Sequence, residues 1–351
     1  MPVEHFGVAA ESAWGAWATA DTFYRIDSFS KDPGRATIEG RYTGFHRALV
    51  QMWPGAKAPS GSLRLAAWGE LLGLLLLAAQ LPDVTTTQPD EAGNPTVYEH
   101  AFLPKDDEPI RSLSAQAQYS GSVGVNILGM VLDKLTISVK AGEAAMIEAD
   151  WVAKDEAPCD GTWDHDGSSS PALVASPTYV SNTIRPLIFY DASVITGGTV
   201  SQDPTTKQLS IAGGTTRTLI ESLEITLENN ADARPFLQPD PTPGNVVAGN
   251  RSITGQFDFD MSTVDPVWYN AMRAGTQMAL QLALAGQIIS TTYKRALVLT
   301  LPLIHITNAP FPDISGSQDR RIQQVQFTAV QDGTVNTDIG VTVRDTQESY
   351  S

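Results

Sequence analysis

The hydrophobic pattern along this chain is mostly that of β-strands. Short segments rich in Val, Ile, Thr and aromatic residues alternate in polarity and are separated by Gly, Pro, Asn and Asp, as is typical of strands joined by turns. The pattern predicts strands at residues 22–29, 36–45, 61–66, 97–103, 131–140, 145–154, 187–195, 220–229, 252–261, 277–284, 295–307 and 322–330. The sequence therefore predicts a mainly β fold.

Two segments interrupt the strands and predict helices. Residues 68–80 are apolar nearly all round, which predicts a buried helix. Residues 266–274 follow Asp265, a good N-cap; Pro266 suits the first helical position and Gly275 the helix end.

The order of these elements occurs twice. Residues 22–154 and 186–330 each give strand, strand, long loop, strand, helix and further strands. One helix at the same point in both favours a divergent internal duplication over the general likeness of all-β chains. We expect an N-terminal arm (1–21), a first domain (22–154), a linker (155–185), a second domain (186–345) and a C-terminal tail (346–351). Residues 168–171 are expected to be the most mobile part of the linker.

Two long loops occupy the same place in the two repeats. Residues 46–60 contain Trp53 and Pro54, and residues 230–251 contain Phe236, Pro239 and Pro241. Long loops in compact domains commonly have a function, and prolines stiffen a loop for binding. We expect these loops to contact a partner; surface loops without one are the alternative.

Acidic side chains share one face of two predicted strands in the second repeat. Alternation places Glu224, Glu228, Asp258 and Asp260 opposite the apolar positions. A glycosidase would need one such carboxylate in an apolar pocket that raises its pKa, and the sequence predicts no such pocket. A solvated polar face accounts for these acids, so no catalytic residue is assigned.

Other candidate chemistry is weak. Residues 160–167 (DGTWDHDG) resemble a Ca²⁺ loop but lack its twelfth-position acid. The five His show no metal-ligand spacing, and the single Cys159 excludes an internal disulfide framework. Nucleotide-binding and hydrolase motifs are absent. We predict neither an enzyme, nor a metal site, nor a cofactor.

Charge and apolar length limit the possible partners. The chain of 351 residues carries 23 Lys plus Arg against 39 Asp plus Glu, a formal net charge of −16. That balance disfavours tight binding to nucleic-acid phosphates. The longest apolar stretch is nine residues (71–79), too short to cross a membrane, and the N-terminus lacks the basic start of a secretory signal. We expect a soluble protein without membrane insertion.

Several short stretches stand in a characteristic order along the chain. They are residues 7–15 (GVAAESAWG) followed by Phe23 and Tyr24, 61–63 running into the Leu-rich 71–79, 189–194 (FYDASV), 221–230 (ESLEITLENN), 251–257 (RSITGQF) and 325–330 (VQFTAV). Together they resemble the tail tube (major tail) proteins of long, non-contractile-tailed bacteriophages over nearly the whole chain. The linker and the Pro-rich residues 234–245 depart from that family's pattern.

The resemblance implies a structural subunit. Each tube domain of the family is a pair of packed β-sheets with one flanking helix, a sandwich or half-barrel. Six domains form a ring whose inner sheets join into a β-barrel around a lumen. A tandem chain would then form a pseudo-hexameric ring from three copies. Stacked rings would conduct double-stranded DNA without binding it specifically. Tape-measure, tail terminator and tail-tip proteins are the implied partners, and the virion tail is the implied location after synthesis in the host cytoplasm.

The resemblance also implies roles for particular residues. Glu39, Glu224, Glu228, Asp258 and Asp260 would line the lumen, where acidic walls repel phosphates; a solvated outer face is the alternative. The residues expected to contact the next ring are Trp53, Pro54, Phe236, Pro239 and Pro241. The N-terminal arm and the C-terminal tail are further candidates for axial contacts. A β-rich receptor- or carbohydrate-binding tail or baseplate module is the second hypothesis.

Overall fold

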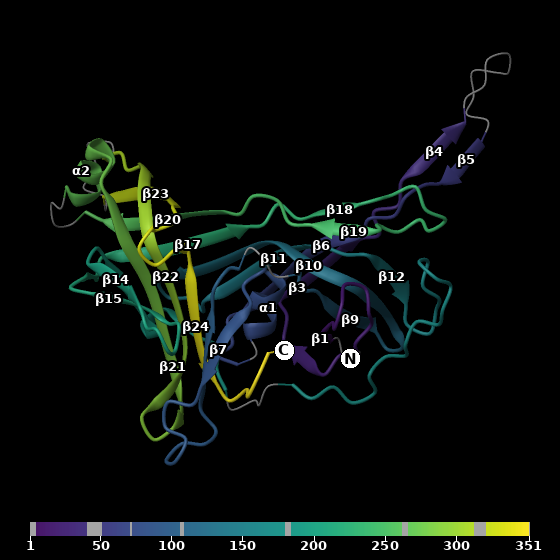
Figure 1. Ribbon diagram of the computed structural model, residues 1–351, viewed down its shortest axis with the longest axis horizontal. Helices are drawn as coiled ribbons and strands as arrows, with labels where there is room; N and C mark the ends of the chain where they lie inside the picture. The colour runs from purple at the N-terminus through teal and green to yellow at the C-terminus, as the bar shows by residue number, and fades with distance from the viewer. Residues whose placement is uncertain are drawn as a thin grey trace.

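The protein is mainly β, as predicted. The computed structural model describes residues 5–40, 51–70, 72–105, 109–179, 184–261, 266–311 and 321–350. Its helices are α1 (Leu72–Ala78), α2 (Val267–Ala274) and a short 3₁₀ turn, η1 (Phe189–Asp191). Strands account for most of the remaining regular structure (Figure 1).

Among the described residues, twelve strands come before residue 160 and twelve come after residue 190. We call these groups the first half and the second half. The first half contains β1 (Phe6–Ala10), β2 (Thr22–Tyr24), β3 (Ser28–Asp32), β4 (Thr37–Gly40), β5 (Gln51–Pro54), β6 (Ser60–Ala66), β7 (Asp83–Thr87), β8 (Tyr98–Phe102), β9 (Leu113–Ser120), β10 (Val123–Lys140), β11 (Met146–Val152) and β12 (Asp155–Pro158). The second half contains β13 (Ala192–Thr196), β14 (Thr199–Gln202), β15 (Leu209–Ala212), β16 (Thr215–Arg217), β17 (Ile220–Glu228), β18 (Asp232–Arg234), β19 (Asn245–Val247), β20 (Ser252–Asp260), β21 (Gln277–Ser290), β22 (Tyr293–Asn308), β23 (Ile322–Ala329) and β24 (Gly340–Asp345).

One antiparallel sheet runs through both halves. Its strand order is β3-β6-β11-β10-β17-β20-β23-β22. The halves join where β10 pairs with β17, from Lys134 opposite Glu228 to Lys140 opposite Ser222. Within the described residues the pairing never returns to β3, so a single chain forms an open sheet.

The same pairing pattern occurs in both halves. In the first, β3-β6-β11-β10 form the sheet and α1 follows β6; in the second, β17-β20-β23-β22 form it and α2 follows β20. The long strands β10 and β22 continue into a second layer. There β10 pairs with β9 and β12, while β22 pairs with β21 and β24. The element order read from the sequence thus has a counterpart in the strand pairing, and the domain boundaries stay predictions.

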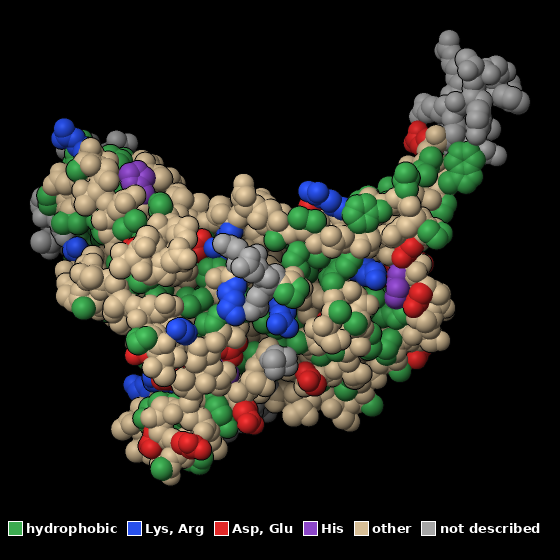
Figure 2. Space-filling view, in the orientation of Figure 1, with side chains coloured by type: hydrophobic (Ala, Val, Ile, Leu, Met, Phe, Trp, Pro, Cys, Tyr) green, Lys and Arg blue, Asp and Glu red, His purple; other side chains and the backbone are tan. Residues whose placement is uncertain are grey.

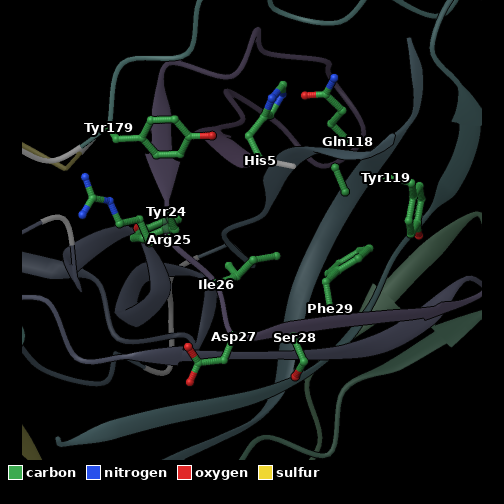
Figure 3. Close-up of a pocket in the computed structure, with 11 residues that line it drawn as sticks. His5, Tyr24, Arg25, Ile26, Asp27, Ser28, Phe29, Gln118, Tyr119 and Tyr179 are labelled. Carbon is green, nitrogen blue, oxygen red and sulfur yellow. The ribbon is translucent and has the colours of Figure 1, made fainter. Parts of the chain in front are cut away.

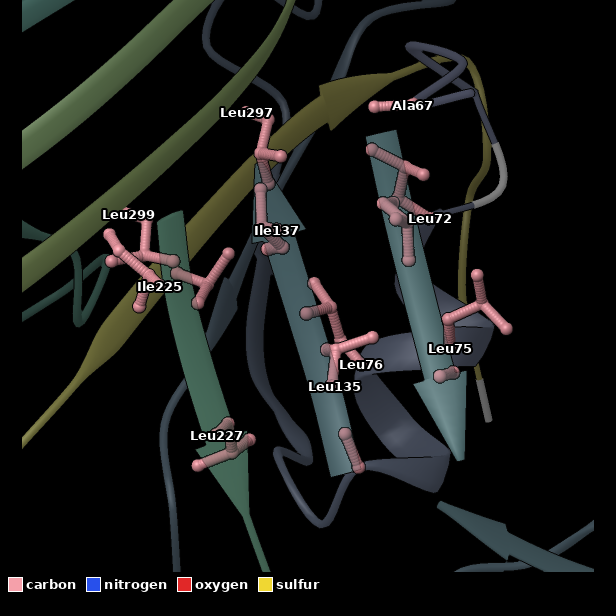
Figure 4. Packing of buried hydrophobic residues seen from close by; sticks show 14 of the residues in the cluster. Ala67, Leu72, Leu75, Leu76, Leu135, Ile137, Ile225, Leu227, Leu297 and Leu299 are labelled. Atoms are coloured by element: carbon pink, nitrogen blue, oxygen red, sulfur yellow. The ribbon is translucent and has the colours of Figure 1, made fainter. Parts of the chain in front are cut away.

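The main hydrophobic core extends across both halves. Leu72, Leu75 and Leu76 of α1 lie against Leu135 and Ile137 of β10 (Figure 4). Every residue of α1 is buried, as the all-round apolar pattern predicted. In the second half, Trp268 of α2 packs edge-on against Phe257, with ring centroids 4.8 Å apart.

The ends of both helices differ from the prediction. The first is shorter than residues 68–80, since it spans Leu72–Ala78. The second begins after Pro266, which occupies the N-cap position instead of the first helical one. Gly275 ends it in the left-handed conformation, with φ 65°, as the sequence predicted. The expected cap Asp265 lies outside the described residues.

The described parts of the expected N-terminal arm, linker and C-terminal tail contact the rest of the fold. Strand β1 lies between β2 and β9 with Phe6 buried. The expected linker starts with β12 on β10 and buries Trp163. Ser170 is also buried, and its Oγ accepts a hydrogen bond of 2.7 Å from Asn126. Tyr350, in the expected tail, is buried as well. Phe6 and Tyr350 belong to the main core, and Trp163 packs in a smaller cluster. Of residues 168–171, Ser170 is buried, whereas Ser168 and Ser169 are exposed.

Candidate assembly surfaces

Four of the five expected acidic site residues lie together on one face of the sheet. Glu224 and Glu228 are on β17, and Asp258 and Asp260 are on the neighbouring β20. All four are half-buried, while the alternate positions of these strands are buried in the core. The period of two in each strand, together with the pairing register, puts them on the side of the sheet away from the core.

Glu39, the fifth of these residues, lies elsewhere. The predicted strand 36–45 does not join the sheet; β4 pairs instead with β5, with Glu39 opposite Met52. The chain leaves the sheet after Asp32, and β4 and β5 project away from the rest of the molecule (Figure 1). Glu39 is exposed there, apart from the other four acids, and its role at the lumen stays a prediction.

Carboxylates outnumber cations on this polar face. Arg64 Nε lies 3.2 Å from Glu148 Oε1, and Lys134 Nζ lies 3.8 Å from Glu228 Oε1. Both pairs are about half exposed, so each contributes at most about 1 kcal/mol. On the five strands from β6 to β20, the charged side chains of this face are Glu148, Asp150, Glu224, Glu228, Asp258 and Asp260 against Arg64, Lys134 and Lys140. Alternating polarity in β11 was the signal for Glu148 and Asp150, which were not chosen as site residues.

The outer strand β3 borders a hollow of about 500 Å³. Tyr24, Phe29, Tyr119 and Tyr179 contribute to its wall, together with His5 (Figure 3). Burial lowers the pKa of His5. The side chain of Tyr119 is 39% exposed at the rim. An aromatic hollow beside an open strand edge is suited to receive apolar side chains.

A second hollow, of about 410 Å³, occupies the corresponding place in the second half. It is formed by β13, β16, β17 and β21, which are the counterparts of β1, β2, β3 and β9 in the pairing pattern. Here Val139 of β10 and Ala141, which follows that strand, form part of the wall. The first half supplies that wall because β10 pairs with β17.

The two expected contact loops lie side by side. Strands β4 and β5 form an extension that we call the arm; it is distinct from the N-terminal arm of residues 1–21. Figure 2 shows hydrophobic side chains along this extension. The backbone N–H of Lys57, at the base of the arm, donates to Pro241 O at 2.7 Å. This contact joins the base of the arm to the second loop, which carries β18 and β19.

Apolar side chains are exposed on both loops. On the arm, Ile38, Met52 and Trp53 are 55%, 60% and 41% exposed, and Pro54 is exposed as well. On the second loop, Phe236 and Leu237 are fully or largely exposed. Pro239 is also exposed, while Pro241 is half-buried. Ile38, Met52 and Leu237 were not among the expected contact residues, although each is an apolar residue in a polar or Pro-rich stretch.

A buried polar cluster joins the C-terminal residues to the first half. His100 Nδ1 lies 2.6 Å from Asp83 Oδ2, and His100 Nε2 lies 2.9 Å from the carbonyl oxygen of Gln347. Burial alone would lower the pKa of His100, but hydrogen bonds to Asp345 and Asp83 and their charges raise it to about 9. Tyr350 donates to Asp345 in the same cluster.

Two kinds of site were sought in the part of the chain that the structure describes. No three His, Cys, Asp or Glu side chains there are placed to hold a metal ion. No described helix combines the length and apolarity needed to cross a membrane.

A protein-family model matches most of the chain. A family model described as "Phage tail tube protein" matches residues 4–329. No curated protein sequence matches. Among solved structures, one described as "Crystal structure of Hcp protein" is 10% identical and covers 44% of this chain and 99% of its own, with a TM-score of 0.19. A TM-score this low does not establish a shared fold.

Proposed function

The chain belongs to the phage tail tube protein family, and we propose that three copies of it close each ring of the tube. Membership makes it a structural subunit of the virion tail, and an enzymatic role is not part of that function. The observation that carries the ring proposal is the junction between the two halves, where β10 pairs with β17.

We expect the contact between neighbouring copies to have the same strand pairing as this junction. Strand β3 corresponds to β17 in the pairing pattern, and β22 corresponds to β10. In the described residues, β21 pairs with β22 only as far as His305, which leaves one side of the end of β22 open. Open strand edges need a partner or a cover. The end of β22 in one copy would therefore pair with β3 of the next, as β10 pairs with β17.

The hollow beside β3 supports this arrangement. Within one chain, the end of β10 lines the corresponding hollow beside β17. The hollow beside β3 borders Phe29 and Tyr119 and would receive the end of β22 from the neighbouring copy. Three copies would contribute 3 × 8 = 24 strands to one closed barrel. Closure would leave no open edge in that barrel.

The polar face of the sheet would line the lumen. Core side chains, helix α1 and the second layer of strands cover the opposite face, so a closed ring with its core outside turns Glu224 and Asp258 inward. An excess of carboxylates repels phosphate groups. Double-stranded DNA would therefore pass through without specific binding.

The arm and the second loop would contact the next ring. Exposed apolar groups such as Trp53 and Leu237 are candidates for such contacts because they gain from burial. Proposed partners beyond further copies of the chain are the tape-measure protein inside the tube and the terminator and tip proteins at its ends.

Electron microscopy of the purified protein, with its solution mass, tests the proposal. Hollow tubes with three chains per ring are expected. Six chains per ring would contradict the three-copy closure. A small closed oligomer that forms no tubes at high concentration would favour the receptor- or carbohydrate-binding module instead.

A further inference from the structure

Cations on both sides of the base of the arm form ion pairs with acids of one loop. Before the arm, Lys31 of β3 pairs with Glu156, and Arg35, between β3 and β4, has its Nη1 2.7 Å from Asp164 Oδ2. Lys57 lies after the arm, where the chain returns from it. The acids belong to residues 155–166, which we call the brace loop. The brace loop thus contacts the chain both where it enters the arm and where it returns from it.

Lys57 is the centre of these contacts. Its Nζ lies 2.8 Å from Asp155 Oδ1, 2.6 Å from Glu156 O and 3.2 Å from Asp164 Oδ2. The exposed fractions of Lys57 and Asp155 are 5% and 0%. Buried charges are costly unless every group keeps its partners, so this geometry resists displacement. The other oxygen of Asp155 accepts the backbone N–H of His165 at 3.1 Å.

The brace loop is itself fixed to the first half. It begins with β12, which pairs with β10, and it buries Trp163 next to Trp17, with ring centroids 5.6 Å apart. Pro241 of the second half contacts the same base through Lys57 N. Both halves therefore hold the base of the arm, whereas the described residues on β4 and β5 beyond it are exposed.

We infer that the brace loop sets the direction in which the arm leaves the ring, and thereby the rotation between successive rings. This inference rests on the proposed contact of the arm with a copy of this chain in the next ring. The arm can be oriented from its base because the charges of Arg35, Lys57 and Asp164 meet there. Loss of this orientation would leave the ring intact and alter how rings stack.

Asp164→Asn tests the inference. The substitution removes the charge shared by Arg35 and Lys57, and because the Asp164 side chain is 39% exposed, the fold is expected to persist. Asp166→Asn is the matched control: it lies two residues away, makes the same charge change and faces His165 at 3.3 Å, not the arm. We expect rings of wild-type mass from both variants. Image reconstruction should show loss of a single ring-to-ring rotation in D164N and the wild-type rotation in D166N.

A third variant separates this inference from the proposed stacking role. Trp53→Ser removes an exposed apolar group of the arm and leaves its base unchanged. If W53S prevents stacking while D164N tubes keep the wild-type rotation and length, the brace inference is overturned and the stacking role stands. Normal tubes from W53S and from a variant lacking residues 37–54 would overturn the stacking role itself.

Discussion

The two halves share one strand-pairing pattern but differ in what borders their outer strands. In the second half, β17 is covered by β10 of the same chain. In the first half, the corresponding strand β3 has an aromatic hollow beside it. The first half also carries the projecting arm, whereas the corresponding loop of the second half lies against the base of that arm. One half thus makes inside the chain the contact that we propose its counterpart makes with another copy.

The largest expected effect is on ring formation, and it comes from a charge placed in the hollow beside β3. We expect Tyr119→Glu to remain a folded monomer, because Tyr119 is 39% exposed in one chain but would be buried between copies. Burying an unpaired carboxylate there strongly opposes closure. Light scattering after gel filtration gives the mass.

The matched control for this variant is Tyr190→Glu. Tyr190 is 66% exposed on η1, outside the proposed contact between copies, so this variant should still form rings. Rings of normal mass from Y119E would show that the hollow beside β3 is not the contact between copies.

Two lysine pairs should differ strongly in their contribution to stability. Lys57→Met leaves Asp155 as a buried charge without its partner, which should cost about 3–5 kcal/mol of unfolding free energy. Lys134→Met breaks the half-exposed pair with Glu228 where the halves join, and should cost at most about 1 kcal/mol. Urea unfolding of both variants measures the difference. Equal losses of unfolding free energy would mean that the buried pair of Lys57 contributes no more to stability than the half-exposed pair of Lys134.

The cluster around His100 should make stability depend on pH. Its pKa is raised to about 9, above the unfolded value of about 6.5. The stabilisation is therefore complete below about pH 6.5 and is lost as the pH rises through about 9. It amounts to about 3 kcal/mol, so the melting temperature should fall between pH 7 and pH 9.5. His100→Gln should flatten that fall, and an unchanged profile in this variant would contradict the assignment.

The sequence predicted what depends on local periodicity and missed what depends on distant partners. Period-two alternation places Glu224 and Asp258 on one face because each strand determines the side of its own residues. It could not place Glu39, since alternation does not say which strand β4 pairs with. The sequence predicted a linker at residues 155–166 because their main partner is distant: Lys57, which pairs with Asp155, lies 98 residues away in the sequence. The local pattern of polar and apolar residues cannot predict a pair between residues so far apart in the sequence.

The smallest expected effect is on assembly when the polar face is neutralised. Glu224→Gln with Asp258→Asn removes two charges while keeping side-chain size, and the exposed pairs on this face contribute little to stability. We expect normal rings and tubes from this variant. In assembled phage, DNA release should be slower, because fewer carboxylates repel the phosphates. Glu91→Gln, in the exposed turn between β7 and β8, changes one charge away from this face and should leave release unchanged. Wild-type release from the double variant would place these acids outside the lumen, and the first half would then have to supply the lining that the second half does not.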